Sequence, residues 1–132
     1  MLRKSLLSSL ALCHLVIATA CNVREQTARI TAQDHRFVPA EIRLSAASPF
    51  RLTLTNEGRE PHEFASPLLT DPQVRILADD SGTARATGRI LVRPGRSADV
   101  AVLAPAGTYL FRCKVRGHGG MTGTLIVESS KT

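Results

Sequence analysis

After Asn22 the sequence consists of short runs of β-forming residues separated by turn residues, and this pattern constrains the fold more than any other feature. In residues 50–55 apolar and polar residues alternate, which predicts a strand with one buried and one solvated face. Turn residues at 56–58, 94–95 and 105–107 separate such runs. The predicted strands span residues 28–32, 41–45, 50–55, 89–93, 98–103, 108–113 and 122–128. About seven short strands with this spacing indicate an all-β, two-sheet β-sandwich.

One segment, residues 66–88, departs from this pattern and is read as an excursion from a single domain that spans residues 21–132. It is polar and contains prolines at positions 67 and 72. Residues 71–79 fit two turns of helix, with Asp71 as N-cap and Pro72 at the first helical position. An irregular loop over one end of the sandwich fits equally well. Connections of this length often border a functional site.

The first twenty residues have the layout of a secretory signal peptide. Arg3 and Lys4 precede an apolar run that ends in small residues. A membrane span is the alternative, but Ser8, Ser9 and His14 interrupt the run, which is shorter than the ~20 apolar residues that a span needs. We therefore expect an exported, periplasmic protein whose mature chain lacks residues 1–20.

Cys21 follows directly after this leader. Ala18, Thr19 and Ala20 fit an ordinary signal peptidase site, and together with Cys21 they resemble a bacterial lipobox in which alanine replaces the usual leucine. In that interpretation a lipid on Cys21 anchors the mature N-terminus to a membrane. A cysteine present by chance and a disulfide between Cys21 and Cys113 are the alternatives. We favour the lipid, which would be the only membrane contact.

The charge pattern argues against nucleic-acid binding. The formal net charge is +6, from 17 basic and 11 acidic residues. The basic residues are spread singly along the chain, whereas nucleic-acid binders cluster them with stacking aromatics. We expect a solvated basic surface that steers weakly toward acidic partners.

The residues with the most informative chemistry lie near the C-terminus. A predicted strand ends in Cys113, a glycine-rich loop presents His118 and Met121, and another strand follows. Thiolate and imidazole bind copper strongly, and a thioether binds at a longer axial distance. His62, after Pro61, adds a second imidazole. His62, Cys113, His118 and Met121 therefore predict a site for one copper ion.

Each ligand taken alone has an ordinary structural explanation. A histidine such as His62 is more often a surface residue, Cys113 a small buried hydrophobe and Met121 core filler. Their joint pattern favours a metal site. Structural zinc would call for Cys or His in place of Met121, and a binuclear copper centre for a second cysteine in the loop. His35 has no partner pattern and is expected to be an ordinary polar residue.

The spacing Cys-x4-His-x2-Met between two strands resembles the ligand loop of the cupredoxins, which include azurin, plastocyanin and pseudoazurin. The resemblance implies a Greek-key β-sandwich with type 1 copper near one end. It also implies a monomeric electron carrier between larger redox proteins, not an enzyme. By position, His62 and His118 are the imidazole ligands, Cys113 the thiolate and Met121 the axial ligand. The resemblance further implies that His118, flanked by glycines, reaches the surface as the electron exit.

The sequence departs from the familiar cupredoxins at two points. Two residues separate His118 from Met121, where familiar members have three or four, so the ligand loop is short. Glu63 follows His62 where asparagine is often found. We expect the Glu63 carboxylate to alter the surroundings of the metal and its potential.

Two further functions fit the same residues. The first is copper handling, in which the protein buffers or delivers the ion without passing electrons. Delivery sites tend to be open and rich in methionine, whereas the mature chain has a single methionine, Met121. The second is an accessory domain of a membrane metal-uptake or respiratory assembly, held in place by a lipid on Cys21.

Overall fold

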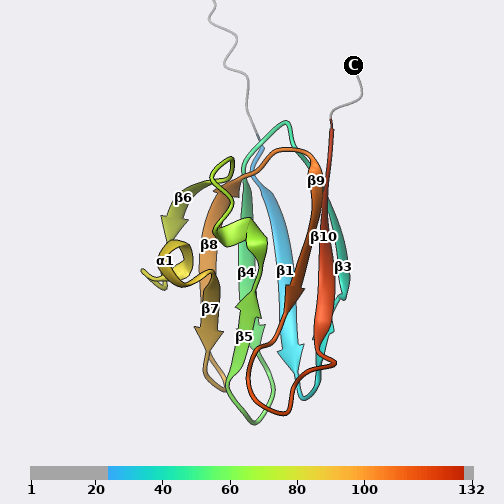
Figure 1. Ribbon diagram of the computed structural model, residues 1–132, viewed down its shortest axis with the longest axis vertical. Helices are drawn as coiled ribbons and strands as arrows, with labels where there is room; N and C mark the ends of the chain where they lie inside the picture. Colours follow the sequence, from blue (N-terminus) through green and yellow to red (C-terminus); the bar gives the residue numbers. More distant parts are fainter. Residues whose placement is uncertain (1–23, 130–132) are drawn as a thin grey trace, which may run out of the picture.

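The computed structural model describes residues 24–129, which form two five-stranded sheets packed face to face (Figure 1). One sheet has the strand order β2-β1-β4-β8-β6 and the other the order β3-β10-β9-β5-β7. The strands are β1 (Gln26–Gln33), β2 (Arg36–Val38), β3 (Glu41–Ser45), β4 (Phe50–Asn56), β5 (His62–Ala65), β6 (Arg75–Asp79), β7 (Arg89–Val92), β8 (Ser97–Leu103), β9 (Gly107–Arg112) and β10 (Thr122–Glu128). The predicted all-β, two-sheet sandwich is confirmed.

The chain passes repeatedly from one sheet to the other. β3, β5 and β7 belong to one sheet, while β4, β6 and β8 belong to the other. β1 pairs with β4 and β3 with β10 in parallel, and the remaining pairs are antiparallel. This arrangement is consistent with a Greek-key sandwich. It brings turns from distant parts of the chain together at each end of the molecule.

The predicted helix at residues 71–79 is wrong. The Asp71 carboxylate accepts a hydrogen bond from the Gln73 backbone at 2.8 Å, and Val74 N–H donates to the Asp71 carbonyl, so these residues form a turn. The chain then extends as β6, which pairs antiparallel with β8. The open edge of β8 supplies backbone partners along the segment, and this pairing overrides the local helix signal.

The excursion at 66–88 completes the hydrophobic core. It contains a short 3₁₀ helix, η1 (Pro67–Leu69), and one turn of α-helix, α1 (Ala84–Thr87). Four of its apolar side chains are buried, those of Leu68, Leu69, Val74 and Ala84. The segment therefore packs against the sandwich and contributes core residues, which an irregular surface loop would not do.

Three phenylalanines join the two sheets near the loop that follows β9. Phe37 lies on β2 of one sheet, and Phe64 and Phe111 lie on β5 and β9 of the other. The Phe111 ring packs edge-on against Phe37 at 5.1 Å and stacks on Phe64 at 4.9 Å, measured between ring centroids. Aromatic pairs in these geometries add about 0.5–1.5 kcal/mol beyond the area they bury. These contacts stabilise the packing of the two sheets near the ligand loop.

The predictions for the leader lie outside the described residues. These are the signal peptide at residues 1–20 and the lipid on Cys21. Between residues 24 and 129, none of the helices has the length and apolar character needed to cross a membrane.

Candidate metal site

The four predicted ligands come from two segments at one end of the sandwich. His62 opens β5, and Cys113 follows the last residue of β9. His118 lies in the loop between β9 and β10, and Met121 directly precedes β10. The β4–β5 and β9–β10 loops both lie at the lower end of the molecule in Figure 1.

Three of the ligands form a tight cluster. One ligand atom each from His62, Cys113 and His118 lies within 4.8 Å of the others. The Cys113 Sγ lies 4.0 Å from Nδ1 of His62 and 3.5 Å from Nδ1 of His118. All three side chains are buried. Both imidazoles thus present the same nitrogen to the sulfur, in a pocket shielded from water.

Backbone hydrogen bonds bring Met121 next to this cluster. Cys113 N–H donates to the Met121 carbonyl at 2.9 Å, and Met121 N–H donates to the His118 carbonyl at 2.9 Å. Met121 is 1% exposed. The short loop is therefore closed by backbone hydrogen bonds, one of which joins its two sulfur-bearing residues at its base.

Glu63 contacts the ligand cluster through its backbone. Its N–H donates to Cys113 Sγ at 3.4 Å, whereas its side chain forms an ion pair with Arg89 at 3.4 Å. Successive residues of a strand point to opposite faces, so the Glu63 side chain lies on the other face of β5 from His62. There it is still mostly buried, at 13% exposed. The effect of the Glu63 carboxylate on the surroundings of the metal and its potential stays a prediction, with that carboxylate held by Arg89.

Burial keeps His62 in its metal-binding form. Loss of solvent lowers the pKa of His62, and the neighbouring His118 lowers it further. A histidine must be neutral to offer a lone pair to a metal ion. The cavity therefore favours the protonation state that ligation needs.

His118 is covered, contrary to the expectation that it reaches the surface. The residue is 3% exposed. Its Nε2 lies 2.7 Å from Oε2 of Glu60, and the His35 ring packs edge-on against it at 5.2 Å. Sequence reasoning assigned no role to Glu60 or His35. Only the fold, which joins the β1–β2 turn and the β4–β5 loop to the ligand loop, reveals these contacts.

The chemistry of this donor set fits one type 1 copper ion. A thiolate and two imidazoles in a dry pocket, with a methionine beside them, are the residues that blue-copper sites use. Free Cys113 is buried, so its sulfur is protected from disulfide exchange with other molecules.

The comparisons with known proteins agree with the observed fold. The family model described as "Cupredoxin-like domain" matches residues 6–127. Among solved structures, auracyanin B has 23% identity and a TM-score of 0.56, over 78% of this chain and 88% of that one.

Two further solved structures are similar in fold. The sodium-dithionite-reduced auracyanin of Roseiflexus castenholzii has 18% identity and a TM-score of 0.57, over 79% of this chain and 98% of that one. Auracyanin A, a "blue" copper protein of Chloroflexus aurantiacus, has 20% identity and a TM-score of 0.56, over 80% and 100%. The search of curated proteins returned no match.

Proposed function

This chain belongs to the cupredoxin-like domain family, and we propose that it is an exported blue-copper protein that passes single electrons. His62, Cys113, His118 and Met121 hold the copper ion in this proposal. The observation that carries it is the buried cluster in which the ligand atoms of two histidines and one cysteine lie within 4.8 Å of one another. The auracyanin folds support it as neighbours in structure.

When bound, a copper ion supplies a one-electron couple between its cupric and cuprous states. The protein's part is to hold the donors in a fixed arrangement. His62 is held by β5, and Cys113 by the end of β9. His118 and Met121 are held by hydrogen bonds within the loop. Because these ligands come from an ordered framework, little rearrangement would oppose the gain or loss of an electron.

The protein also keeps water away from the site. His62, Cys113, His118 and Met121 are all at most 4% exposed. The Glu63 N–H that points at Cys113 Sγ adds a hydrogen bond to the sulfur. Hydrogen bonds to the thiolate and exclusion of solvent are two of the factors that set the reduction potential of such sites.

An absorption spectrum tests the proposed function. Addition of cupric ion to the purified protein is expected to give an intense blue or green colour that bleaches with mild reductant and returns with oxidant. Cys113→Ser is expected to abolish the colour because it removes the thiolate. Leu110→Ala on β9, the strand that leads to Cys113, changes an exposed side chain, serves as the control and is expected to keep the colour.

A colourless, redox-silent complex would contradict electron transfer and would assign the site to copper buffering or delivery. Failure of the wild-type protein to bind copper at all would remove the metal site. Both outcomes are read from the same titration, with circular dichroism to establish that each variant is folded.

Export and membrane attachment complete the proposal. The leader pattern supports a periplasmic protein with a lipid on Cys21. Without Arg3 and Lys4 of the leader, 15 basic and 11 acidic residues leave a net charge of +4, which supports a larger redox partner with an acidic docking face. Mass spectrometry of the mature protein distinguishes a lipidated from a free Cys21. Electron transfer to an acidic partner is expected to slow as salt is added, and a rate independent of salt would contradict this choice of partner.

A further inference from the structure

His118 uses its two ring nitrogens for different contacts. Nδ1 faces the Cys113 sulfur at 3.5 Å, whereas Nε2 lies 2.7 Å from a carboxylate oxygen of Glu60. A neutral imidazole carries its proton on one nitrogen only. A carboxylate at Nε2 accepts that proton's hydrogen bond and leaves the lone pair of Nδ1 directed toward the ligand cluster.

The other imidazole has no such contact. His62 Nε2 is buried and has no hydrogen-bond partner among residues 24–129. The carboxylate nearest to it is that of Asp34, at 3.9 Å. Asp34 Oδ1 instead accepts a hydrogen bond from Arg59 N–H at 2.8 Å. The close carboxylate contact is therefore specific to His118.

The loop that carries Glu60 is held in place by its own hydrogen bonds. The buried Asn56 side chain donates to the Glu60 carbonyl and to the Val92 carbonyl, each at 2.8 Å, and accepts from Gly58 N–H at 2.8 Å. A Cβ on Gly58 would lie 2.6 Å from Asp34 Oδ1 and 2.7 Å from His62 Nε2. Only a glycine lets the loop pass this close to the ligand histidine.

The rest of the His118 ring is enclosed by two other imidazoles. His35 packs edge-on at 5.2 Å, and His62 lies tilted at 4.9 Å, both measured between ring centroids. The His118 side chain is 2% exposed although the Glu60 side chain is 63% exposed. Glu60 is thus the contact between a buried ligand ring and the solvent side of the loop.

We propose that Glu60 is a positioning residue that fixes the orientation of His118 and, through its negative charge, favours the cupric over the cuprous state. The second part rests on the proposed copper function, and the first does not. A carboxylate on the outer nitrogen of a ligating histidine fixes the ring and increases its strength as a donor. Stronger donation stabilises the more highly charged ion.

Three variants separate the hydrogen bond from the charge. Glu60→Gln keeps an oxygen that accepts from Nε2–H and removes the charge. Glu60→Ala removes both. Glu57→Ala removes an exposed charge from the same loop and serves as the matched control.

The first measurement uses metal-free protein and nitrogen-15 NMR of the imidazoles. We expect a slowly exchanging Nε2–H on His118 in the wild type, in Glu60→Gln and in Glu57→Ala. In Glu60→Ala this proton is expected to exchange rapidly, and part of the population to carry the proton on Nδ1. An unchanged Nε2–H signal in Glu60→Ala would overturn the positioning role.

The second measurement compares the affinities for copper(II) and copper(I) and the reduction potential. Loss of such a carboxylate typically weakens metal binding 10- to 100-fold, and we expect Glu60→Ala to lose about tenfold in copper(II) affinity with a smaller loss for copper(I). A tenfold loss confined to copper(II) raises the potential by about 59 mV. Glu60→Gln is expected to lie between wild type and Glu60→Ala.

If Glu60→Ala and Glu57→Ala shift the reduction potential from the wild-type value by the same amount, the role of the Glu60 charge is overturned. The effect would then be that of any charge in the loop. Should the wild type bind no copper, the proposed function fails and the cupric preference fails with it. The NMR result on metal-free protein still decides the positioning of His118 in that case.

Discussion

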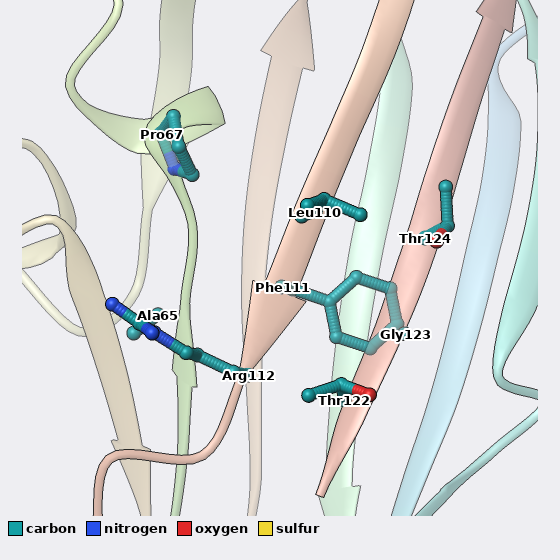
Figure 2. Close-up of a pocket in the computed structure, with 8 residues that line it drawn as sticks. All are labelled: Ala65, Pro67, Leu110, Phe111, Arg112, Thr122, Gly123 and Thr124. Carbon is teal, nitrogen blue, oxygen red and sulfur yellow. The ribbon is translucent and has the colours of Figure 1, made fainter.

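The ring of Phe111 occupies the space that a side chain at position 123 would need. A Cβ placed on Gly123 would lie 2.2 Å from Cζ of Phe111, far inside van der Waals contact. The two residues are directly paired across β9 and β10, and Figure 2 shows the ring reaching across to Gly123. Each lies two positions from a predicted sulfur ligand, so this contact supports the base of the ligand loop.

Gly123→Ala is expected to destabilise the protein because the Phe111 ring cannot move without disturbing its stacking on Phe64. Overpacking of this kind costs about 1–3 kcal/mol. Urea unfolding of the metal-free protein measures it. Gly119→Ala is the control, since a Cβ there meets no atom of the described residues within 4 Å. Its free energy of unfolding is expected to change by less than about 0.5 kcal/mol. Equal effects of the two substitutions would contradict the steric explanation.

Asn56→Ala is expected to be more costly, because it removes three hydrogen bonds from the β4–β5 loop. The substitution leaves the Gly58 N–H and the carbonyls of Glu60 and Val92 without their partner. Each buried unsatisfied group costs about 1–3 kcal/mol, so a loss of at least about 2 kcal/mol is expected. Thr55→Ala is the control.

Within residues 24–129, the only side-chain hydrogen bond of the Thr55 hydroxyl is an exposed one with the Ser97 hydroxyl, at 2.9 Å. Its removal is expected to cost less than about 1 kcal/mol. Urea midpoints of the two variants decide between these expectations. A loss from Asn56→Ala no larger than that from Thr55→Ala would show that the loop is held in some other way.

The sequence was sufficient to predict the strands and the ligands whose signals are local. Alternation within residues 50–55 is a property of neighbouring residues, and β4 follows it. Cys113, His118 and Met121 lie in one short loop, so their chemistry is visible without a fold. The prediction of His62 as a ligand required only the expectation that a sandwich brings a strand distant in sequence to the end of the molecule that holds the ligand loop.

The parts that could not be predicted depend on contacts between distant residues. Glu60 and His118 are 58 positions apart, and a surface glutamate in a turn carries no local sign of its partner. Strand β6 exists because β8 offers an open edge, while the local residues Asp71 and Pro72 suggested a helix. His35 was given no role because its contact with His118 forms only once the β1–β2 turn meets the ligand loop.

Asp79, the last residue of β6, is expected to make the free energy of unfolding depend on pH. Burial alone would raise its pKa, but hydrogen bonds from the Ser81 side chain and from the backbone of Ala84, Ser81 and Gly82 outweigh this and lower the pKa. A carboxylate with a lowered pKa in the folded state stabilises the protein above its unfolded pKa of about 3.9, and this contribution is lost as pH falls through the folded value.

Asp79→Asn is therefore expected to be less stable than the wild type at pH 7, and the difference is expected to shrink once the pH falls below about 3.9. Urea unfolding at neutral and acid pH measures both. The exposed neighbour Asp80→Asn is the control and is expected to change stability little at either pH. A difference between Asp79→Asn and wild type that persists unchanged at acid pH would rule out ionisation of Asp79 as its cause.

Met121→Leu tests the proposed axial ligand, and Leu125→Met on β10, the strand that follows Met121, is its matched control. Both residues are buried, and exchanges between leucine and methionine conserve volume and cost less than about 1.5 kcal/mol. Removal of the thioether leaves the cupric ion with one donor fewer in a drier pocket, which disfavours the more highly charged state. Met121→Leu is therefore expected to keep the thiolate colour and to raise the potential by about 59 mV for each tenfold loss of cupric relative to cuprous affinity. Voltammetry measures the shift, Leu125→Met is expected to show none, and an unshifted potential in Met121→Leu would exclude Met121 as a ligand.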